Sequence, residues 1–107
     1  MKQVYIDFKY GNNKQLVLSG KKILTSRNYN PTRLLKGEIG YFYLEGIKIF
    51  IKYYGELKHS QVKEKTLVDY YEGEAFKHTD KGEPTEKRTK DFIKGKGKKH
   101  IFKLKLE

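Results

Sequence analysis

The feature that most limits the fold of this chain is a pair of aromatic and β-branched runs in residues 39–54, IGYFYLEGIKIFIKYY. Such residues favour strands, and the Glu45-Gly46 pair between the runs suits the tight turn of a hairpin. In the second run alternate residues face opposite sides, Ile47, Ile49, Ile51 and Tyr53 against Lys48, Phe50, Lys52 and Tyr54. The hairpin therefore predicts a β-sheet, with Tyr41, Tyr43, Tyr53 and Tyr54 in core and rim packing rather than in a base-stacking platform.

Three further strands and three helices are predicted around this hairpin from the spacing of apolar residues. The strands are expected at 2–10, 21–27 and 100–107. The helices are expected at 14–20, where Gly20 ends the first one, at 61–71 and at 86–93. In the last strand Phe102, Leu104 and Leu106 face inward, whereas Ile101, Lys103 and Lys105 face outward. At 107 residues the chain predicts a single α+β domain, 1–107, with a mixed sheet that curls into a small open barrel.

The positive charge of the chain is concentrated at its two ends. There are 24 Lys and Arg against 13 Asp and Glu, a formal net charge of +11. Residues 1–36 hold eight basic residues and one acidic residue, and residues 86–107 hold nine and three. Chain ends are often neighbours in compact domains, so the two basic segments are expected to form one face. Such a face attracts a polyanion, and we expect RNA or another single-stranded nucleic acid, with a lysine-rich solubility surface as the alternative.

The residue types also exclude several classes of site. The chain has no cysteine, which rules out a disulfide scaffold, a thiolate zinc site and a cysteine nucleophile. His59, His78 and His100 lack metal-ligand spacing, so no metal and no other cofactor is expected. No apolar run reaches the roughly 18 residues that span a bilayer, and residues 1–20 lack a signal-peptide core. We therefore expect a cytoplasmic monomer that does not bind a membrane.

The segment 18–27, LSGKKILTSR, is similar to the Gly-x-Lys-x-x-x-x-Arg signature of ASCH domains, which are members of the PUA-like superfamily. Gly20, Lys22 and Arg27 match that signature. Two further family features have counterparts here, a Gly-acid pair before the next strand at Gly37-Glu38 and an acid-Gly pair at Glu72-Gly73. The resemblance covers nearly the whole chain. It implies a PUA-like mixed sheet or open β-barrel with two or three short flanking helices.

Many ASCH domains carry a Glu two residues before the signature Arg, where this chain has Thr25. The resulting Lys-x-x-Thr-x-Arg pattern is similar to that of small bacterial amidohydrolases that remove the acyl group from acetylated cytidine. This resemblance implies a catalytic trio of Lys22, Thr25 and a downstream glutamate, either Glu72 or Glu74. On a regular strand Lys22 and Thr25 point to opposite faces, so the site requires a bulge or a bend. The alternatives are an anion contact for Lys22 and ordinary strand packing for Thr25.

A binding module would use the same segment differently. Arg27 beside Lys22 is suited to hold a phosphate, and its alternative is a buried ion pair with Glu38 or Glu72. The loop NYNPTR offers Tyr29 as a base-stacking residue. Further nucleic-acid contacts are expected from Arg33, Lys36, Lys96, Lys98 and Lys99.

The size of the charge ranks these functions. An enzyme that acts on an uncharged nucleoside has little use for a net +11, so we expect an ASCH-type domain that binds RNA or a nucleotide in a basic cleft. A small amidohydrolase acting on acetylated cytidine or a related nucleoside is the second hypothesis. A ribonuclease of the same family and a protein-interaction adaptor rank below both.

Overall fold

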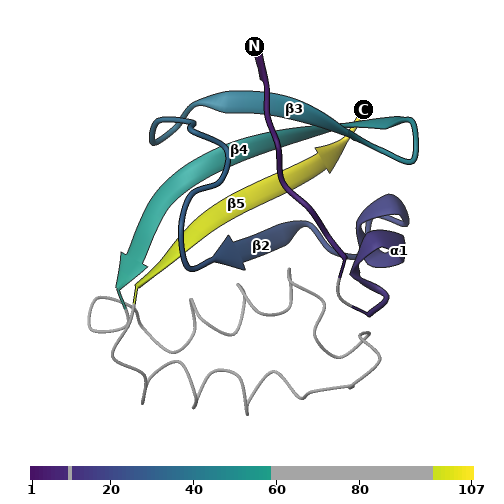
Figure 1. Cartoon of the computed structure of the whole chain (residues 1–107), viewed down its shortest axis with the longest axis horizontal. Coiled ribbons are helices and arrows are strands. Elements are labelled where there is room, and N and C mark those ends of the chain that lie inside the picture. Colours follow the sequence, from purple (N-terminus) through teal and green to yellow (C-terminus); the bar gives the residue numbers. More distant parts are fainter. Residues whose placement is uncertain (10, 59–97) are drawn as a thin grey trace.

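A single curved sheet of five strands organises the computed structural model, which describes residues 1–9, 11–58 and 98–107. The elements in chain order are β1 (Lys2–Gln3), α1 (Asn13–Leu18), β2 (Leu24–Arg27), β3 (Ile39–Leu44), β4 (Ile47–Lys58) and β5 (Lys98–Leu106). Across the sheet the order is β1-β3-β4-β5-β2 (Figure 1). Only β1 is parallel to its neighbour, and the other pairs are antiparallel.

The predicted hairpin is confirmed as β3 and β4. The register runs from Leu44 opposite Ile47 to Ile39 opposite Lys52. Glu45 and Gly46 both have positive φ, at 50° and 77°, which matches a two-residue turn of type I′. Such a turn twists with its strands, so this local sequence is enough to set the register of the central pair.

The predicted strand over 2–10 is wrong for most of its length. Only Lys2 and Gln3 pair with β3, and the Val4 N–H extends this contact with a bond to the Tyr41 carbonyl. The chain then crosses one face of the sheet (Figure 1). The side chains of Ile6 and Phe8 in this crossing segment are buried. The alternation of apolar residues therefore indicated correctly that one side of this segment is buried. It did not show that the segment pairs with another strand, because an unpaired extended segment can have the same alternation.

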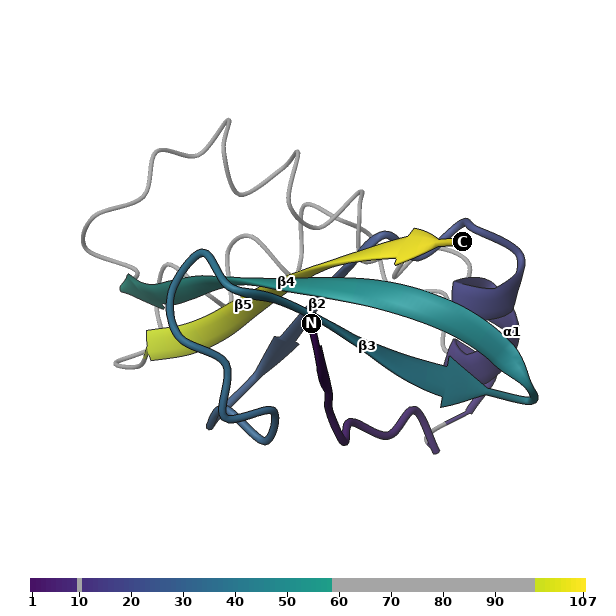
Figure 2. The ribbon, with the colours of Figure 1, turned by 90° about the horizontal axis from the view of Figure 1, so that it is seen from above.

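One face of the sheet carries the core. Figure 2 shows the N-terminal segment and the loop 28–38 on the same side of the sheet. The buried cluster joins this segment, this loop and α1 to β3, β4 and β5: Ile6, Phe8, Val17, Leu34, Phe42, Ile49, Ile51, Tyr53, Phe102 and Leu104. We call this side of the sheet the core face.

Strand β5 differs from its prediction at its start. It begins at Lys98, so Lys98 and Lys99 precede the predicted start at residue 100 and belong to the strand. A bulge between Tyr53 and Gly55 shifts the register with β4, and Gly55 has a φ of 99° there. Phe102 and Leu104 face the core as predicted. Ile101, predicted to face outward, is nevertheless buried, with 8% of its surface exposed.

The α+β class is shown, with a mixed sheet and one short helix in the described part of the chain. Helix α1 ends before Gly20, which has a φ of 77°, as the sequence predicts. The helices expected at 61–71 and 86–93 lie outside the described residues. The sheet does not close, since β1 and β2 stand at opposite edges. Within residues 1–9, 11–58 and 98–107 no helix has the length and apolarity needed to cross a membrane.

Candidate nucleic-acid interface

Two predicted site residues, Thr25 and Arg27, meet on the core face of β2. The Thr25 side chain is fully buried, and its hydroxyl accepts a hydrogen bond from Arg27 Nη1 at 2.5 Å. Arg27 Nη1 also donates to the Ser26 carbonyl at 2.8 Å, and Nη2 donates to the Asp7 carbonyl at 2.8 Å. The guanidinium carbon lies 5.0 Å from the centre of the Phe8 ring.

These contacts give Arg27 a structural task. Its donors tie the N-terminal segment, through Asp7, to β2, and its flat guanidinium covers Phe8 at the edge of the core. Glu38, one of the two ion-pair partners that the sequence offered for Arg27, accepts hydrogen bonds from Lys2 and from the Leu35 backbone instead. Arg27 thus joins the N-terminal segment to β2, whereas the sequence analysis expected it to bind a phosphate in a cleft.

Lys22 is buried at the margin of a hollow. It is 5% exposed, and its backbone N–H donates to the Leu16 carbonyl at 3.0 Å, which fixes the chain behind α1. The hollow has a volume of about 360 Å³. The described residues that line it are Val17, Gly20, Lys22, Ile23, Ile49, Lys103, Leu104, Lys105 and Leu106. Thr25 is not among them, and β2 begins after Lys22, so strand alternation does not govern how the two side chains are placed.

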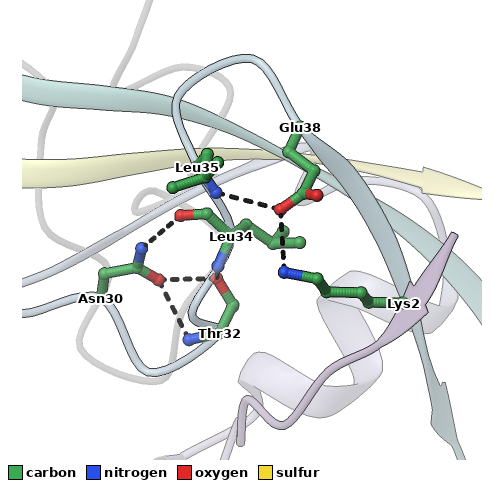
Figure 3. A network of polar contacts seen from close by, with 6 residues as sticks. All are labelled: Lys2, Asn30, Thr32, Leu34, Leu35 and Glu38. Atoms are coloured by element: carbon green, nitrogen blue, oxygen red, sulfur yellow. Dashed lines mark hydrogen bonds and ion pairs between the residues drawn. The ribbon is translucent and has the colours of Figure 1, made fainter.

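The loop that carries Tyr29 and Arg33 is fastened by one asparagine (Figure 3). Asn30 Oδ1 accepts from both the backbone N–H and the hydroxyl of Thr32, at 3.0 and 2.6 Å, and Asn30 Nδ2 donates to the Leu34 carbonyl at 2.9 Å. The Thr32 hydroxyl in turn accepts from the Leu34 N–H at 3.2 Å. The turn between them places Arg33 at a φ of 59°. These hydrogen bonds therefore fix the shape of the loop, and the Leu34 side chain packs in the core.

Glu38 closes the same loop (Figure 3). One carboxylate oxygen accepts from the Leu35 N–H at 3.1 Å and from Lys2 Nζ at 3.4 Å. The backbone hydrogen bond from Leu35, followed by the charge of Lys2, lowers the pKa of Glu38 below its usual value. The carboxylate is therefore engaged in the protein's own loop closure.

The remaining predicted binding residues do not form one group. Tyr29, Arg33 and Lys36 are exposed on the loop 28–38. Lys99 Nζ donates to the Asn28 side chain, and Lys98 starts β5. Glu72, Glu74 and Lys96 lie outside the described residues. In the ranges that the structure covers, no three His, Asp or Glu gather as a potential metal site.

The opposite side of the sheet carries a set of aromatic and basic side chains, and the prediction had not joined them into one surface. Residues that alternate with the core positions of β3, β4 and β5 share this side, and we call it the basic-aromatic face. Its members are Tyr41, Tyr43, Lys48, Phe50, Lys52, Tyr54, Lys103 and Lys105. Tyr43 is 54% exposed and Tyr54 is 43% exposed.

The strand register sets these side chains in rows. Tyr41 is opposite Phe50, and Phe50 is opposite Lys105 on its other side. In the next row Lys52 is opposite Lys103. The aromatic residues thus concentrate over β3 and β4, and the lysines concentrate over β4 and β5.

Cation–π contacts link the two kinds of side chain. Lys48 Nζ lies 4.8 Å from the Tyr41 ring centre and 5.3 Å from that of Phe50. Lys52 Nζ lies 5.4 Å from the ring centre of Tyr54. In the described part of the chain no ion pair joins any of the four face lysines to an acid. Among the residues that the structure describes, the face therefore carries a local positive charge with no carboxylate paired to it.

A group of three polar side chains on the core face, Tyr53, His100 and Glu56, offers a different chemistry. The Tyr53 hydroxyl and His100 Nδ1 are 2.6 Å apart, and His100 Nε2 lies 3.6 Å from a Glu56 carboxylate oxygen. The rings of Tyr53 and His100 stack with centres 5.8 Å apart. The bulge in β4 makes this possible, because it places Glu56 opposite His100. The Tyr53 side chain is buried, so this group forms part of the core edge.

The sequence contained the information that would have located the basic-aromatic face. Core and rim packing is right for Tyr53, but Tyr41, Tyr43 and Tyr54 lie on the other side of the sheet. The missing step was to place the outward residues of two predicted strands beside each other, Lys48, Phe50 and Lys52 of the hairpin and Lys103 and Lys105 of the last strand.

Comparison with known proteins adds no assignment. No protein-family model matches this chain, and no curated protein or solved structure matches it.

Proposed function

We propose that this domain binds RNA or another single-stranded nucleic acid through its basic-aromatic face. The observation that carries the proposal is the juxtaposition of exposed tyrosines with four lysines that have no acidic partner in the described residues. Lysines supply phosphate contacts, and aromatic rings supply stacking surfaces for unpaired bases. A net charge of +11 extends the attraction beyond the face itself.

The magnitudes favour a single strand as the ligand. Stacking of a base on an aromatic side chain contributes about 1–3 kcal/mol, whereas an exposed cation–π contact contributes about 0.5–1 kcal/mol. A ring of this face therefore gains more free energy from stacking on an unpaired base than from its cation–π contact with a lysine. A duplex keeps its bases stacked inside and offers only its backbone and groove edges, so it gains no such term.

We also retain the ASCH-type, PUA-like identity as a proposal. It is supported by the Gly20, Lys22 and Arg27 pattern and by the mixed sheet. In this proposal the face and the segment 18–27 belong to one binding domain, and a cytoplasmic monomer stays our expectation.

The test is a titration with a single-stranded oligouridylate at several salt concentrations. The variant Lys103→Thr/Lys105→Thr removes two charges from the face, and threonine keeps the strand preference of β5. Each phosphate contact with a single strand contributes about 0.7 to the slope of log affinity against log salt, so the slope should fall by about 1.4.

The matched control is Lys9→Thr/Lys21→Thr, which removes the same charge from exposed positions away from the face. It should leave the slope nearly unchanged. Equal effects of the two double variants would show that binding follows total charge rather than this face. Absence of binding by the wild type at low salt would refute the proposed function.

Deacylation of an acetylated nucleoside is the second candidate, and the buried position of Lys22 at a hollow of about 360 Å³ favours it. That volume suits a small ligand. Turnover of acetylated cytidine that is kept in Thr25→Ser and lost in both Thr25→Val and Lys22→Met would support this candidate. Turnover unchanged by those substitutions would assign the activity to other residues.

A further inference from the structure

The position of Lys48 on the basic-aromatic face raises a question about access to the stacking surface. Its ammonium lies over two rings at once, 4.8 Å from the centre of Tyr41 and 5.3 Å from that of Phe50. These two aromatic residues are direct partners across β3 and β4. The Lys48 side chain therefore occupies the place where a base would stack on either ring.

Lys105 provides a contrast within the same row. It is the other cross-strand neighbour of Phe50 and is exposed, but no cation–π contact joins it to a ring in the described part of the chain. Lys48 and both rings beneath it are only half-exposed. The two lysines of this face thus differ in whether the ammonium covers an aromatic ring, and Lys105 is the more exposed of the two.

An acidic alternative for Lys48 is near but is not used. The Glu107 N–H donates to the Lys48 carbonyl at 3.3 Å, which brings the end of β5 next to this residue. Yet no ion pair joins Lys48 to an acid in the ranges that the structure describes. The rings are the contact that the ammonium makes.

We infer, on the basis of the proposed function, that Lys48 is a displaceable cap on the Tyr41–Phe50 stacking surface. A base that stacks there must move the ammonium aside, and stacking is the stronger of the two contacts with a ring. The flexible four-carbon stem of lysine lets the displaced ammonium turn to the phosphate of the same strand. Lys48 therefore opposes binding through the rings and favours binding through the phosphate.

The two effects respond differently to salt. A phosphate contact weakens as salt rises, because the counterions that binding releases return to a more concentrated solution. The competition for the rings remains at every salt concentration, since base and ammonium cannot occupy the same surface. Removal of Lys48 should therefore weaken binding at low salt and strengthen it at high salt.

The experiment compares Lys48→Thr with Lys105→Thr in titrations of a single-stranded oligouridylate over a tenfold range of salt. Over this tenfold range of salt, the affinity of each variant should fall about fivefold less than that of the wild type. This is the effect of one phosphate contact with a single strand. The Lys48→Thr curve should cross that of the wild type and show tighter binding at the high-salt end. The Lys105→Thr curve should approach the wild-type curve from below without crossing it.

A second measurement uses the wild-type chain and so does not depend on how the variants fold. The ε-methylene protons of Lys48 should show upfield ring-current shifts in the NMR spectrum of the free protein and move downfield as the oligouridylate is added. Parallel curves for the two lysine variants, or ε-methylene shifts that do not move on binding, would overturn the cap while leaving nucleic-acid binding intact. Failure of the wild type to bind would refute the proposed function itself, and the cap with it.

Discussion

The core face of the sheet carries Thr25, Arg27 and His100, and the basic-aromatic face on its other side carries Lys48, Lys52 and Lys103. These three core-face side chains are hydrogen-bonded within the protein: Thr25 to Arg27, Arg27 to the Asp7 carbonyl and His100 to Tyr53. On the basic-aromatic face the lysines contact aromatic rings or solvent and no acid in the described residues. Polar groups that are satisfied internally stabilise the fold, whereas uncompensated charges beside exposed rings are available to a ligand.

The largest expected difference between the faces concerns stability. Phe102 is fully buried on the core face and stacks on Tyr53 with ring centres 5.1 Å apart. Phe102→Ala should lower the free energy of unfolding by about 3–5 kcal/mol, because burial is lost and a cavity remains. Phe50→Ala, the matched change on the half-exposed outer side, should cost less than half as much. Urea denaturation of both variants measures the difference, and equal losses would mean that the outer face is covered like the core.

Arg27 distinguishes a structural role from a ligand-binding role. Arg27→Lys removes the fork of donors that reaches Thr25 and Asp7, and we expect a loss of about 2 kcal/mol in unfolding free energy. Its affinity for single-stranded RNA should stay close to that of the wild type at a temperature where both are folded. Unchanged stability with clearly weaker RNA binding would instead restore the cleft around Arg27 as the binding site.

Two exposed tyrosines test which aromatic residues meet a base. Tyr43 belongs to the basic-aromatic face and packs edge-on against Tyr41, with ring centres 6.0 Å apart. Tyr29 is 67% exposed on the loop 28–38, where the sequence analysis placed a stacking residue. Tyr43→Ala should weaken oligouridylate binding by about 1 kcal/mol, or roughly fivefold, and Tyr29→Ala should have a smaller effect. The opposite order would move the stacking surface from the sheet to the loop.

The parts of the fold that the sequence predicted well depend on neighbouring residues. The β3–β4 hairpin follows from two aromatic and β-branched runs around Glu45-Gly46, and the end of α1 follows from Gly20. In both cases the determining contacts lie within a few residues of each other. The order of the sheet and the partner of each outer strand depend instead on contacts between distant segments.

The errors have the same origin. The segment 2–10 has the alternation of a strand, but a pairing partner beyond Gln3 is a tertiary property that alternation does not encode. Ile101 is buried although it alternates with the core residues of β5, and the alternation of one strand does not reveal what covers its outward residues. The basic-aromatic face likewise appears only when β4 and β5 are placed side by side, although its residues were visible one strand at a time.

The predicted site residues show the same difference between local contacts, which the sequence predicts, and contacts between distant segments, which it does not. The sequence named Lys22, Thr25 and Arg27 as one constellation, and the structure joins Thr25 to Arg27 directly. It gives Lys22 a separate position at the hollow beside α1. Spacing along the chain identified residues that are buried or partly buried, but the way in which their polar atoms are satisfied depends on Asp7 and on other distant groups.

The smallest expected effect concerns Glu38, which closes the loop over the core face through the Leu35 N–H and Lys2. The pKa of this carboxylate is lowered in the folded chain, so its ionised form stabilises the fold. That contribution is present above the unfolded pKa of about 4.5 and is lost as the pH falls through the lower folded value. Wild type should therefore melt slightly above Glu38→Gln at neutral pH, and the two should converge in acid.

The exposed residue Glu107 provides the control for this comparison, since its side chain makes no hydrogen bond in the ranges that the structure describes. Glu107→Gln should not reproduce the pH-dependent gap in melting temperature. Added salt should reduce the part of the Glu38 effect that Lys2 supplies and leave the part that depends on the Leu35 hydrogen bond. A gap that persists unchanged at acid pH would show that Glu38 stabilises the loop through packing rather than through its charge, and the polar closure of the core face would then lack one of its members.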